Sequence, residues 1–380
     1  MRKTDIATID FLNNIPEDAT DFFVAGDLSA TNVLIGVYTN TRRGIQPITE
    51  GTYNGQKVQD FNTQVLADLI AYSGVPVDRI TRKVFSPAGP ISPDKRTCKV
   101  TNAPFSLEAD VKTALINDYA AIAYAIARLG AQLKHIFLKH SDGSLEKAVD
   151  KMKIGIHGAG TGFGTSRLVM FGKSGEELYT PIDSEGGHKF LAVDEFDEEE
   201  VAIKKWLYKF TGGRIPHVEA VLSGRGIQNV FDYFISHEIM TGKCVGIREI
   251  LRGLADSEDA AAYIAQRAKQ DKGIFWDAMR FFWKIYGRCL HDLAVHENAR
   301  GGIWVAGGII RKNIETYPGS GQADRDIEKI MMEEFDSGPT HTDWVNKIPV
   351  RVILDKRVGL EGAISVASTT EYFERERYKG

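Results

Sequence analysis

The N-terminal part of the chain alternates short apolar runs with polar turns. An apolar run at 22–25 ends at Gly26, and a second one follows at 33–38. Two such runs around a short polar stretch predict a β-hairpin with its tip at 27–32. Shorter apolar runs predict further strands at 83–86, 97–100 and 114–116, and helical spacing predicts a helix at 61–72.

The middle of the chain carries the signals of a capped helix and of a second hairpin. Asn117 and Asp118 precede an alanine-rich run at 119–129. Asn or Asp commonly caps the N-terminus of a helix, and glycine, here Gly130, commonly follows its C-terminus. Further on, apolar runs predict strands at 154–157 and 166–171, on either side of a glycine-rich stretch.

The C-terminal part predicts a long helix and a buried strand. Apolar residues recur on one face of 274–295, which is typical of a core helix. The run 303–306 predicts a buried strand that leads into Gly307, Gly308 and another helix. The charged stretch 139–150 predicts a surface excursion, and 319–325 a loose loop.

The larger pattern repeats once. Each half opens with a strand, a polar turn and a strand, the first turn at Asp27 and the second at Gly158. Two similar lobes with a nucleotide between them would place both turns on the same phosphates. The chain therefore favours two α/β lobes.

The second of these turns carries glycine at every other position. Its notable residues are Gly158, Gly160, Thr161, Gly162 and Gly164. A hairpin turn alone needs one or two such residues. Polyphosphate needs backbone N–H groups at close range, and small residues permit that approach. We predict a phosphate loop at 158–164, with small-residue loops at 26–32 and 306–309 as further phosphate contacts. A dinucleotide fingerprint is excluded because no helix follows the loop.

Two acidic residues stand out near these loops. Asp118, like Asn117, can be a simple helix cap, but a helix N-terminus also keeps a carboxylate ionised, which suits a base in phosphoryl transfer. Asp27 at a hairpin tip is by itself a common turn residue. Together with Thr31 and Asn32 and the other loops, it is better explained by a role near a metal or phosphate.

Glu185 and His188 flank a Gly-Gly pair, which leaves room for a ligand to approach the backbone. His188 can donate to or accept from a sugar hydroxyl. A metal role for His188 is disfavoured, because no Cys or His cluster accompanies it in the sequence. Ser223 lacks the context of a hydrolase nucleophile, and His157 at a strand end is expected to be structural.

Composition narrows the remaining choices. The 380 residues suggest two domains. A net charge of -4 gives no electrostatic footprint for nucleic acid. The three cysteines, Cys98, Cys244 and Cys289, are too few and too far apart for a disulfide framework, which favours a reducing compartment. The segment from Met1 to Asn14 does not have the pattern of a signal peptide, and apolar runs are too short for a membrane span.

The chain resembles the bacterial-type glucokinase family, within the actin-like ATPase superfamily that also holds hexokinases. The resemblance runs from about residue 22 to about residue 363. Its landmarks follow in family order at 26–32, 86–90, 101–102, 116–118, 158–164, 184–188, 221–224 and 305–309. Each motif alone is weak, and the ordered set is strong.

The resemblance implies a two-lobed actin-like ATPase (ribonuclease H-like) α/β fold around a cleft. We expect a small domain at 1–116, joined by a C-terminal helix at 360–380, and a large domain at 117–359. The implied reaction is ATP-dependent phosphorylation of glucose to glucose 6-phosphate with Mg²⁺. The implied assembly is a cytoplasmic homodimer, and composition adds the expectation of no nucleic-acid or membrane partner.

The resemblance also implies the site residues. Asp118 takes the proton from the sugar 6-hydroxyl. The other predicted sugar ligands are Asn102, Asn117, Glu185, His188 and Glu219. The predicted nucleotide contacts are Asp27, Ser29, Ala30, Thr31, Asn32, Gly158, Gly160, Thr161, Gly162, Gly307 and Gly308, with Asp27 near Mg²⁺, through water.

One departure from the family pattern leaves alternatives open. The family usually has Gly-Gly where Ser29 and Ala30 stand, so each adds a Cβ where the backbone should meet phosphate. We expect a shifted loop, or a hydroxyl contact from Ser29. The departure permits a sugar-sensing protein of the same fold that has lost catalysis. A glycoside hydrolase using Glu185 and Glu219 is disfavoured, because glycine-rich loops have no role in it. The hexose and the phosphate donor, whether ATP, ADP or polyphosphate, stay open.

Overall fold

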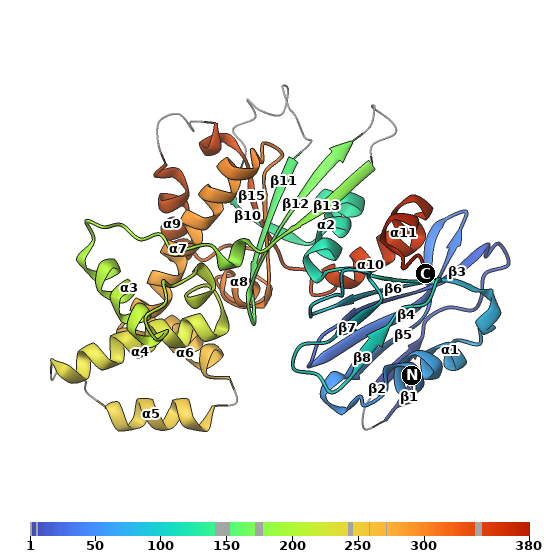
Figure 1. Cartoon of the computed structure of the whole chain (residues 1–380), viewed down its shortest axis with the longest axis horizontal. Helices are drawn as coiled ribbons and strands as arrows, with labels where there is room; N and C mark the ends of the chain where they lie inside the picture. Colours follow the sequence, from blue (N-terminus) through green and yellow to red (C-terminus); the bar gives the residue numbers. More distant parts are fainter. Residues whose placement is uncertain are drawn as a thin grey trace. The chain divides into compact units, whose positions relative to one another are not determined.

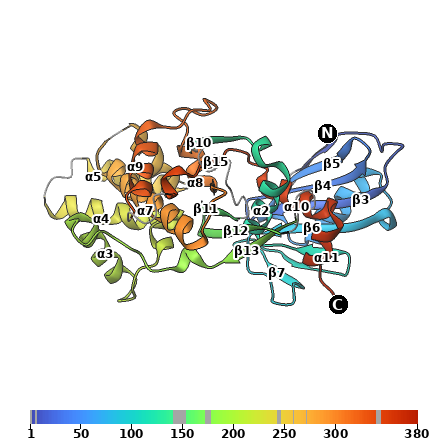
Figure 2. The same cartoon turned by 90° about the horizontal axis from the view of Figure 1, so that it is seen from above.

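The structure is a computed structural model that divides into two compact units. It describes residues 2–4, 7–140, 153–171, 178–241, 246–257, 259–270, 272–338 and 344–380. Unit 1 comprises Met1–Leu133 and Asp355–Gly380, and unit 2 comprises Lys134–Leu354. Figures 1 and 2 show the elements of each unit. Most of the excursion predicted at 139–150 lies outside the described residues.

The first boundary differs from the one expected before Asn117. Helix α2 (Asp118–Leu129) packs closely against α10 (Val358–Ser368), so it stays in unit 1. A Cβ on Gly362 of α10 would collide with the backbone oxygen of Ala121 in α2, so only glycine allows this approach. The C-terminal helix expected at 360–380 is two helices, α10 and α11 (Thr370–Glu376), and both belong to unit 1.

Unit 1 is built on a seven-stranded sheet of order β1-β2-β5-β4-β3-β6-β9. Its strands are β1 (Arg2–Lys3), β2 (Ala7–Phe11), β3 (Asp21–Leu28), β4 (Asn32–Thr41), β5 (Gly44–Asn54), β6 (Ile80–Pro87) and β9 (Thr113–Leu115). β3 pairs antiparallel with β4 and parallel with β6. The hairpin predicted around 27–32 is confirmed. Two short strands, β7 (Thr97–Lys99) and β8 (Ser106–Glu108), pair separately.

Helices cover both faces of this sheet (Figures 1 and 2). α2, α10 and α11 bury one apolar cluster with Phe23 and Val84 of the sheet. The other cluster lies under the segment predicted as a helix at 61–72. That segment begins as a π-helical turn, Asn62–Ala67, and continues as α1 (Asp68–Ser73). The predicted apolar face is present, but the segment changes from π-helical to α-helical hydrogen bonding along its length.

Unit 2 is built on a six-stranded sheet of order β10-β15-β14-β11-β12-β13. Its strands are β10 (His135–Lys139), β11 (Lys153–Ala159), β12 (Phe163–Phe171), β13 (Leu178–Ser184), β14 (Ile303–Ala306) and β15 (Val350–Ile353). β11 pairs antiparallel with β12 and parallel with β14. This repeats the arrangement of β3, β4 and β6 in unit 1, so the predicted repeat of the two halves is confirmed.

The core of unit 2 is centred on α7 (Ile274–Glu297), the long helix predicted from its apolar face. Its stripe of Phe275, Met279, Phe282, Tyr286, Leu290 and Leu293 is buried. α7 packs against α4 (Gly224–Met240), α6 (Ala260–Gln270) and α9 (Arg325–Asp336). The described part of this unit also contains the α-helices α3 (Glu198–Phe210), α5 (Ile247–Asp256) and α8 (Gly308–Asn313). No helix among the described residues combines the length and the apolar content needed to span a bilayer.

Candidate active site

The turn between β3 and β4 is closed by its own hydrogen bonds. The backbone N–H of Ser29 and its hydroxyl both donate to the carbonyl oxygen of Asn32, each at 2.9 Å, and the hydroxyl accepts from Asn32 N–H at 3.2 Å. Gly55 N–H donates to Thr31 O at 3.3 Å. A Cβ on Gly55 would lie 2.5 Å from Ser29 O. The glycine at 55, just after β5, therefore allows the turn to pack closely against the backbone there. The Ser29 hydroxyl therefore shapes this loop, and its predicted contact with phosphate stays a prediction.

Asp27 lies at the end of β3, one residue before the strand stops, and is partly buried. Burial, and then the nearby negative charge of Asp118, raise the pKa of Asp27 to about 7. A Cβ on Gly359 at the start of α10 would lie 2.5 Å from Asp27 Oδ2. The absence of a side chain at 359 thus leaves space for this carboxylate, which the sequence alone did not indicate.

Asn117 and Asp118 start α2 as predicted. The Asn117 side-chain oxygen caps the helix by accepting from the N–H groups of Tyr119 at 2.8 Å and Ala120 at 3.3 Å. Asp118 Oδ1 also accepts from Tyr119 N–H, at 3.0 Å. Both side chains are partly exposed. The amide nitrogen of Asn117 can donate to a ligand while its oxygen caps the helix.

Asn102 is exposed, in the turn between β7 and β8. Its φ of 59° lies in the left-handed region, which Asn tolerates better than most residues. The side-chain amide of Gln56 donates to Asn102 O at 2.7 Å and fixes this turn. The contact of Asn102 with the sugar stays a prediction.

The glycine loop at 158–164 is the tip of the β11–β12 hairpin. Gly158 pairs with Gly164 and Ala159 with Phe163, so the loop proper is Gly160, Thr161 and Gly162. The Gly160 N–H donates to Gly162 O at 2.8 Å. A Cβ on Gly160 would point into open space. The predicted strand–loop–strand connection is confirmed.

Gly307 and Gly308 lie beside the glycine loop. β14 runs parallel to β11, with Ala306 opposite Gly158, so both strands end at the same edge of the sheet. Gly307 has a φ of 99°, and a Cβ there would collide with the backbone of Ala159. Two segments that are far apart in the sequence thus form one small-residue surface, as a phosphate-binding site requires.

Glu219 joins this surface through one hydrogen bond. Its Oε2 accepts from the backbone N–H of Phe163 at 2.8 Å, and a Cβ on Gly162 would lie 2.6 Å from the same oxygen. Ser223 donates to Glu219 O at 2.9 Å and accepts from Gly226 N–H, which caps α4. Ser223 therefore has a structural role, in agreement with its poor context as a nucleophile.

Glu185 and His188 lie in the turn after β13 and are exposed. A Cβ on Gly187 would collide with the backbone oxygen of Phe163, so this turn packs on the start of β12. The chain then pairs with the segment before Glu219, because Lys189 O accepts from Val218 N–H at 2.9 Å and Phe190 forms a bridge with His217. His188 and Glu219 are therefore neighbours in space, although helix α3 lies between them in the sequence.

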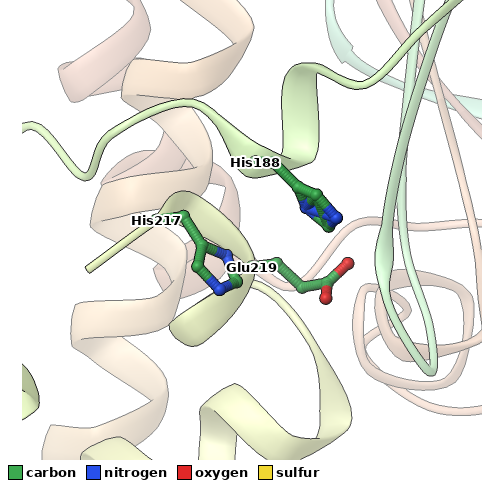
Figure 3. Close-up of side chains that lie close together, drawn as sticks. All are labelled: His188, His217 and Glu219. Carbon is green, nitrogen blue, oxygen red and sulfur yellow. The ribbon is translucent and has the colours of Figure 1, made fainter. Parts of the chain in front are cut away.

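His217 is the neighbour that sequence analysis missed (Figure 3). Its ring centroid lies 5.3 Å from that of His188. One ligand atom each from His188, His217 and Glu219 lies within 4.8 Å of the other two. The expectation that His188 has no His cluster around it is wrong, because it considered only neighbours in sequence. The His-x-Glu spacing of 217 and 219 was the available signal.

His157 is structural, as expected. It is buried in β11, and Thr165 Oγ1 lies 2.9 Å from its Nδ1. Burial, with the positive charge of Lys189 next, lowers its pKa to about 3, so this imidazole is neutral near pH 7.

The predicted residues thus form one group in each unit. In unit 1, Asp27 and Asp118 lie close enough for the charge of Asp118 to raise the pKa of Asp27. In unit 2, the glycine loop, Gly307, Glu219 and His188 form a continuous surface. Such a surface offers backbone N–H groups for an anion next to side chains that can bind hydroxyl groups.

Comparison with known proteins finds relatives along almost the whole chain. A family model described as Glucokinase matches residues 24–370. The glucokinase of Synechocystis sp. is 29% identical over 375 residues, covering 91% of this chain and 98% of the relative. The glucokinase of Caulobacter vibrioides is 28% identical over 359 residues, covering 92% and 95%.

Solved structures agree in fold. A glucokinase from an Antarctic psychrotroph has a TM-score of 0.68 at 20% identity, with 92% of this chain and 99% of that chain covered. A glucokinase from Balamuthia mandrillaris in complex with glucose has a TM-score of 0.64 at 18% identity, covering 92% and 94%. A ROK family glucokinase from Streptomyces griseus in complex with glucose and AMPPNP has a TM-score of 0.54 at 16% identity, covering 90% and 97%. The predicted actin-like ATPase α/β fold is confirmed.

Proposed function

The chain belongs to the glucokinase family and is a glucose kinase, and from that premise we propose that it transfers the γ-phosphoryl group of ATP to the 6-hydroxyl of glucose. Asp118 acts as the general base. The observation that carries this proposal is the family match across 24–370, which includes every predicted site residue.

Asp118 accepts the hydroxyl proton late in the transfer. Phosphoryl transfer passes through a loose transition state, so the protein mainly positions the reactants and stabilises charge. Asp118 lies in the first turn of α2, where the helix N-terminus attracts negative charge, and the Tyr119 N–H bond orients its carboxylate. A carboxylate has capacity for further hydrogen bonds, so Asp118 can hold the sugar hydroxyl as well.

Five side chains bind the remaining sugar hydroxyls. The proposed set is Asn102, Asn117, Glu185, His188 and Glu219. The Asn117 cap supports this role, because it orients the amide nitrogen while its oxygen is occupied. The Phe163–Glu219 hydrogen bond supports it too, because it fixes one carboxylate oxygen and leaves acceptor capacity for a hydroxyl.

The small-residue loops hold the nucleotide. We assign the phosphates to Ser29, Ala30, Thr31 and Asn32 and to Gly158, Gly160, Thr161 and Gly162, with Gly307 and Gly308 against the adenosine. The adjacency of the last two sets at one sheet edge supports this assignment. Backbone N–H groups there can cradle phosphate because no Cβ keeps it away.

Asp27 fits a magnesium site. Mg²⁺ prefers carboxylate oxygens together with water and substrate phosphates. The raised pKa of Asp27 means that its ionised form lacks a compensating positive charge, which a cation supplies. When bound, Mg²⁺ neutralises charge on the phosphates during transfer. The protein supplies the carboxylate and the space left by Gly359.

We further propose that the protein works in glycolysis as a cytoplasmic homodimer. Three widely spaced cysteines suit a reducing compartment. Light scattering of the purified chain tests the dimer: a mass of one chain at working concentration would contradict it.

The function is tested by a matrix of sugars and phosphate donors in an assay of ADP release. We expect glucose with Mg-ATP to give the highest kcat/KM. In the same assay, Asp118→Asn should lower kcat by about 10²- to 10⁴-fold, because general base catalysis contributes about that much. Glucose binding, measured by calorimetry, should persist.

The matched control is Asp78→Asn, which removes an exposed carboxylate of the same unit. Its kcat should equal that of the unmodified chain. Near-normal turnover of Asp118→Asn would show that another group is the base. Retained glucose binding with no turnover in any combination would favour the sugar-sensing alternative, which the Ser29-Ala30 departure permits.

A further inference from the structure

We infer that His188, His217 and Glu219 form a binding site for Zn²⁺ or a similar transition-metal ion, and that this ion competes with glucose. The three side chains come from two turns that pair with each other in unit 2 (Figure 3). They are the one group of three potential metal ligands among the described residues. The competition rests on the proposed function, and the metal site itself does not.

The donor set selects the class of metal. Two imidazoles and a carboxylate suit zinc, copper or nickel, whereas Mg²⁺ prefers oxygen ligands. Three protein ligands with a fourth position for water or substrate are typical of catalytic zinc sites, whereas structural zinc sites have four protein ligands. Donors in a tetrahedral zinc site lie about 3.4 Å apart, as follows from metal–ligand distances near 2.1 Å. The ligand atoms here lie within 4.8 Å of one another, so small side-chain rotations bring them together.

The surrounding structure holds the donors in place. Val218 N–H donates to Lys189 O, and Phe190 forms a bridge with His217, so the turns that carry His188 and His217 keep a fixed spacing. The Phe163 N–H holds Glu219 Oε2 at 2.8 Å, which is the kind of outer hydrogen bond that orients metal-binding carboxylates. In the part of the chain that the structure describes, the buried Nδ1 of His217 has no hydrogen-bond partner. A metal ion can therefore bind His217 without breaking a hydrogen bond at this atom.

Shared ligands make the two occupants exclusive. His188 and Glu219 belong to the proposed sugar-binding set, whereas His217 does not. An imidazole or carboxylate bound to Zn²⁺ gives up lone pairs that a sugar hydroxyl needs. Free Zn²⁺ should therefore raise the apparent KM for glucose without lowering kcat, and glucose should weaken Zn²⁺ binding by the same factor.

Calorimetric titration of the metal-stripped full chain with ZnCl₂ tests the site without any activity readout. We expect one site per chain whose affinity falls about tenfold or more in His217→Ala. His296→Ala removes an exposed histidine of the same unit and should leave the affinity unchanged. His188→Ala serves as a second ligand variant, because His188 is exposed and its removal takes no side chain from the core. Equal Zn²⁺ affinity in the unmodified chain and both ligand variants would overturn the inference.

Kinetics at fixed excess Mg-ATP, with free Zn²⁺ set by a metal buffer, test the competition. We expect the glucose KM to rise with Zn²⁺ in the unmodified chain and in His296→Ala, to stay constant in His217→Ala, and to recover after chelation. Zinc binding that requires His217 but ignores glucose would keep the metal site and contradict the sugar role of His188 and Glu219. Failure to bind zinc with normal glucose kinetics would reject the metal site and leave the proposed function intact.

Discussion

Asp27 and Asp118 are two carboxylates of one unit in different surroundings. Asp118 begins a helix and accepts a backbone N–H, whereas burial and the charge of Asp118 raise the pKa of Asp27 to about 7. Near pH 7 the ionisation of Asp27 therefore opposes folding. We interpret Asp27 as a cation-binding group whose ionised form destabilises the fold while no cation is bound. A bound cation would lower the pKa of Asp27 and remove this destabilisation.

The replacement Asp27→Asn should increase stability and reduce activity. The pKa of Asp27 is about 7 in the folded state and 3.8 in the unfolded state, so the folded state holds this proton more tightly. The stability that the bound proton contributes is fully present below pH 3.8 and is lost as the pH rises to about 7. The variant should gain about 2 to 3 kcal/mol more at pH 8 than at pH 5, since one pKa unit corresponds to about 1.4 kcal/mol. Urea unfolding at the two pH values measures the gain.

The same variant should lower kcat, because its amide cannot neutralise a cation. Asp78→Asn is the control for both measurements, and we expect neither stability nor kcat to change with it. A stability gain that is identical at pH 5 and pH 8 would contradict the raised pKa of Asp27.

Residues whose role follows from their neighbours along the chain were predictable from the sequence. Asn117 and Asp118 were predictable because a helix cap depends on the residues that follow it. His217 was not, because its proximity to His188 depends on the bridge between Phe190 and His217. Gly359 was missed for the same reason, since its contact with Asp27 joins the first and the last parts of the chain.

At the scale of elements, the β11–β12 hairpin connects two functions. Its loop carries the glycines proposed to hold phosphate, and its first residue in β12 donates to Glu219. The hairpin itself was predictable from two apolar runs around a glycine-rich tip. The parallel pairing with β14, which brings Gly307 to the same edge, was not predictable from local pattern, because it joins distant strands.

Two alanine substitutions in this loop should have different effects. Gly162→Ala places a Cβ 2.6 Å from Glu219 Oε2, so the flexible Glu219 side chain must move. We expect the KM for glucose to rise several-fold while the melting temperature changes little. Gly160→Ala places its Cβ in open space, so it should raise the KM for ATP and leave that for glucose unchanged. Steady-state kinetics with each substrate varied in turn distinguish the two, and equal effects on both substrates would contradict the assignment.

A buried charge network connects α3, α7 and the turn before α3. Glu200 is fully buried, pairs with Arg288 and Lys284, and accepts from Asp194 N–H at 2.8 Å. Burial alone would raise the pKa of Glu200, but the hydrogen bonds from Arg288 and Lys284 hold it below its usual value. This network ties the outer helix α3 to the core helix α7.

Removing one partner should be costly. Glu200→Ala leaves two cations without their buried carboxylate and should destabilise unit 2 by about 3 to 5 kcal/mol. Glu195→Ala, at an exposed position just before α3, is the control and should have almost no effect. Urea unfolding followed by tryptophan fluorescence measures the difference, and a loss below about 1 kcal/mol would contradict the role given to the network.

At the scale of the whole molecule, the two units have separate apolar cores. One core lies within 134–354, and the other clusters lie within unit 1. All five tryptophans, Trp206, Trp276, Trp283, Trp304 and Trp344, belong to unit 2. Tryptophan fluorescence therefore follows the unfolding of unit 2, whereas circular dichroism follows both units.

We expect the two units to unfold in separable steps. Glu200→Ala should shift the fluorescence transition and leave a second dichroism transition in place, and Asp27→Asn should shift the second transition alone. Coincident shifts in both signals for both variants would show that the chain unfolds as one cooperative unit. Length and the repeated strand–turn–strand pattern predicted two lobes, but the boundary after Leu133 depends on the packing of α2 on α10.

The short distance between position 162 and the Glu219 carboxylate also limits how the sequence can diverge. A side chain at 162 is compatible with an acid at 219 only if that acid is shorter or turns away, so the two positions should vary together among descendants of this chain. A double-mutant cycle with Gly162→Ala and Glu219→Asp would express this dependence as a coupling energy. A substitution in the glycine loop would thereby change which sugar the protein prefers, even if none of the residues proposed to contact the sugar is replaced.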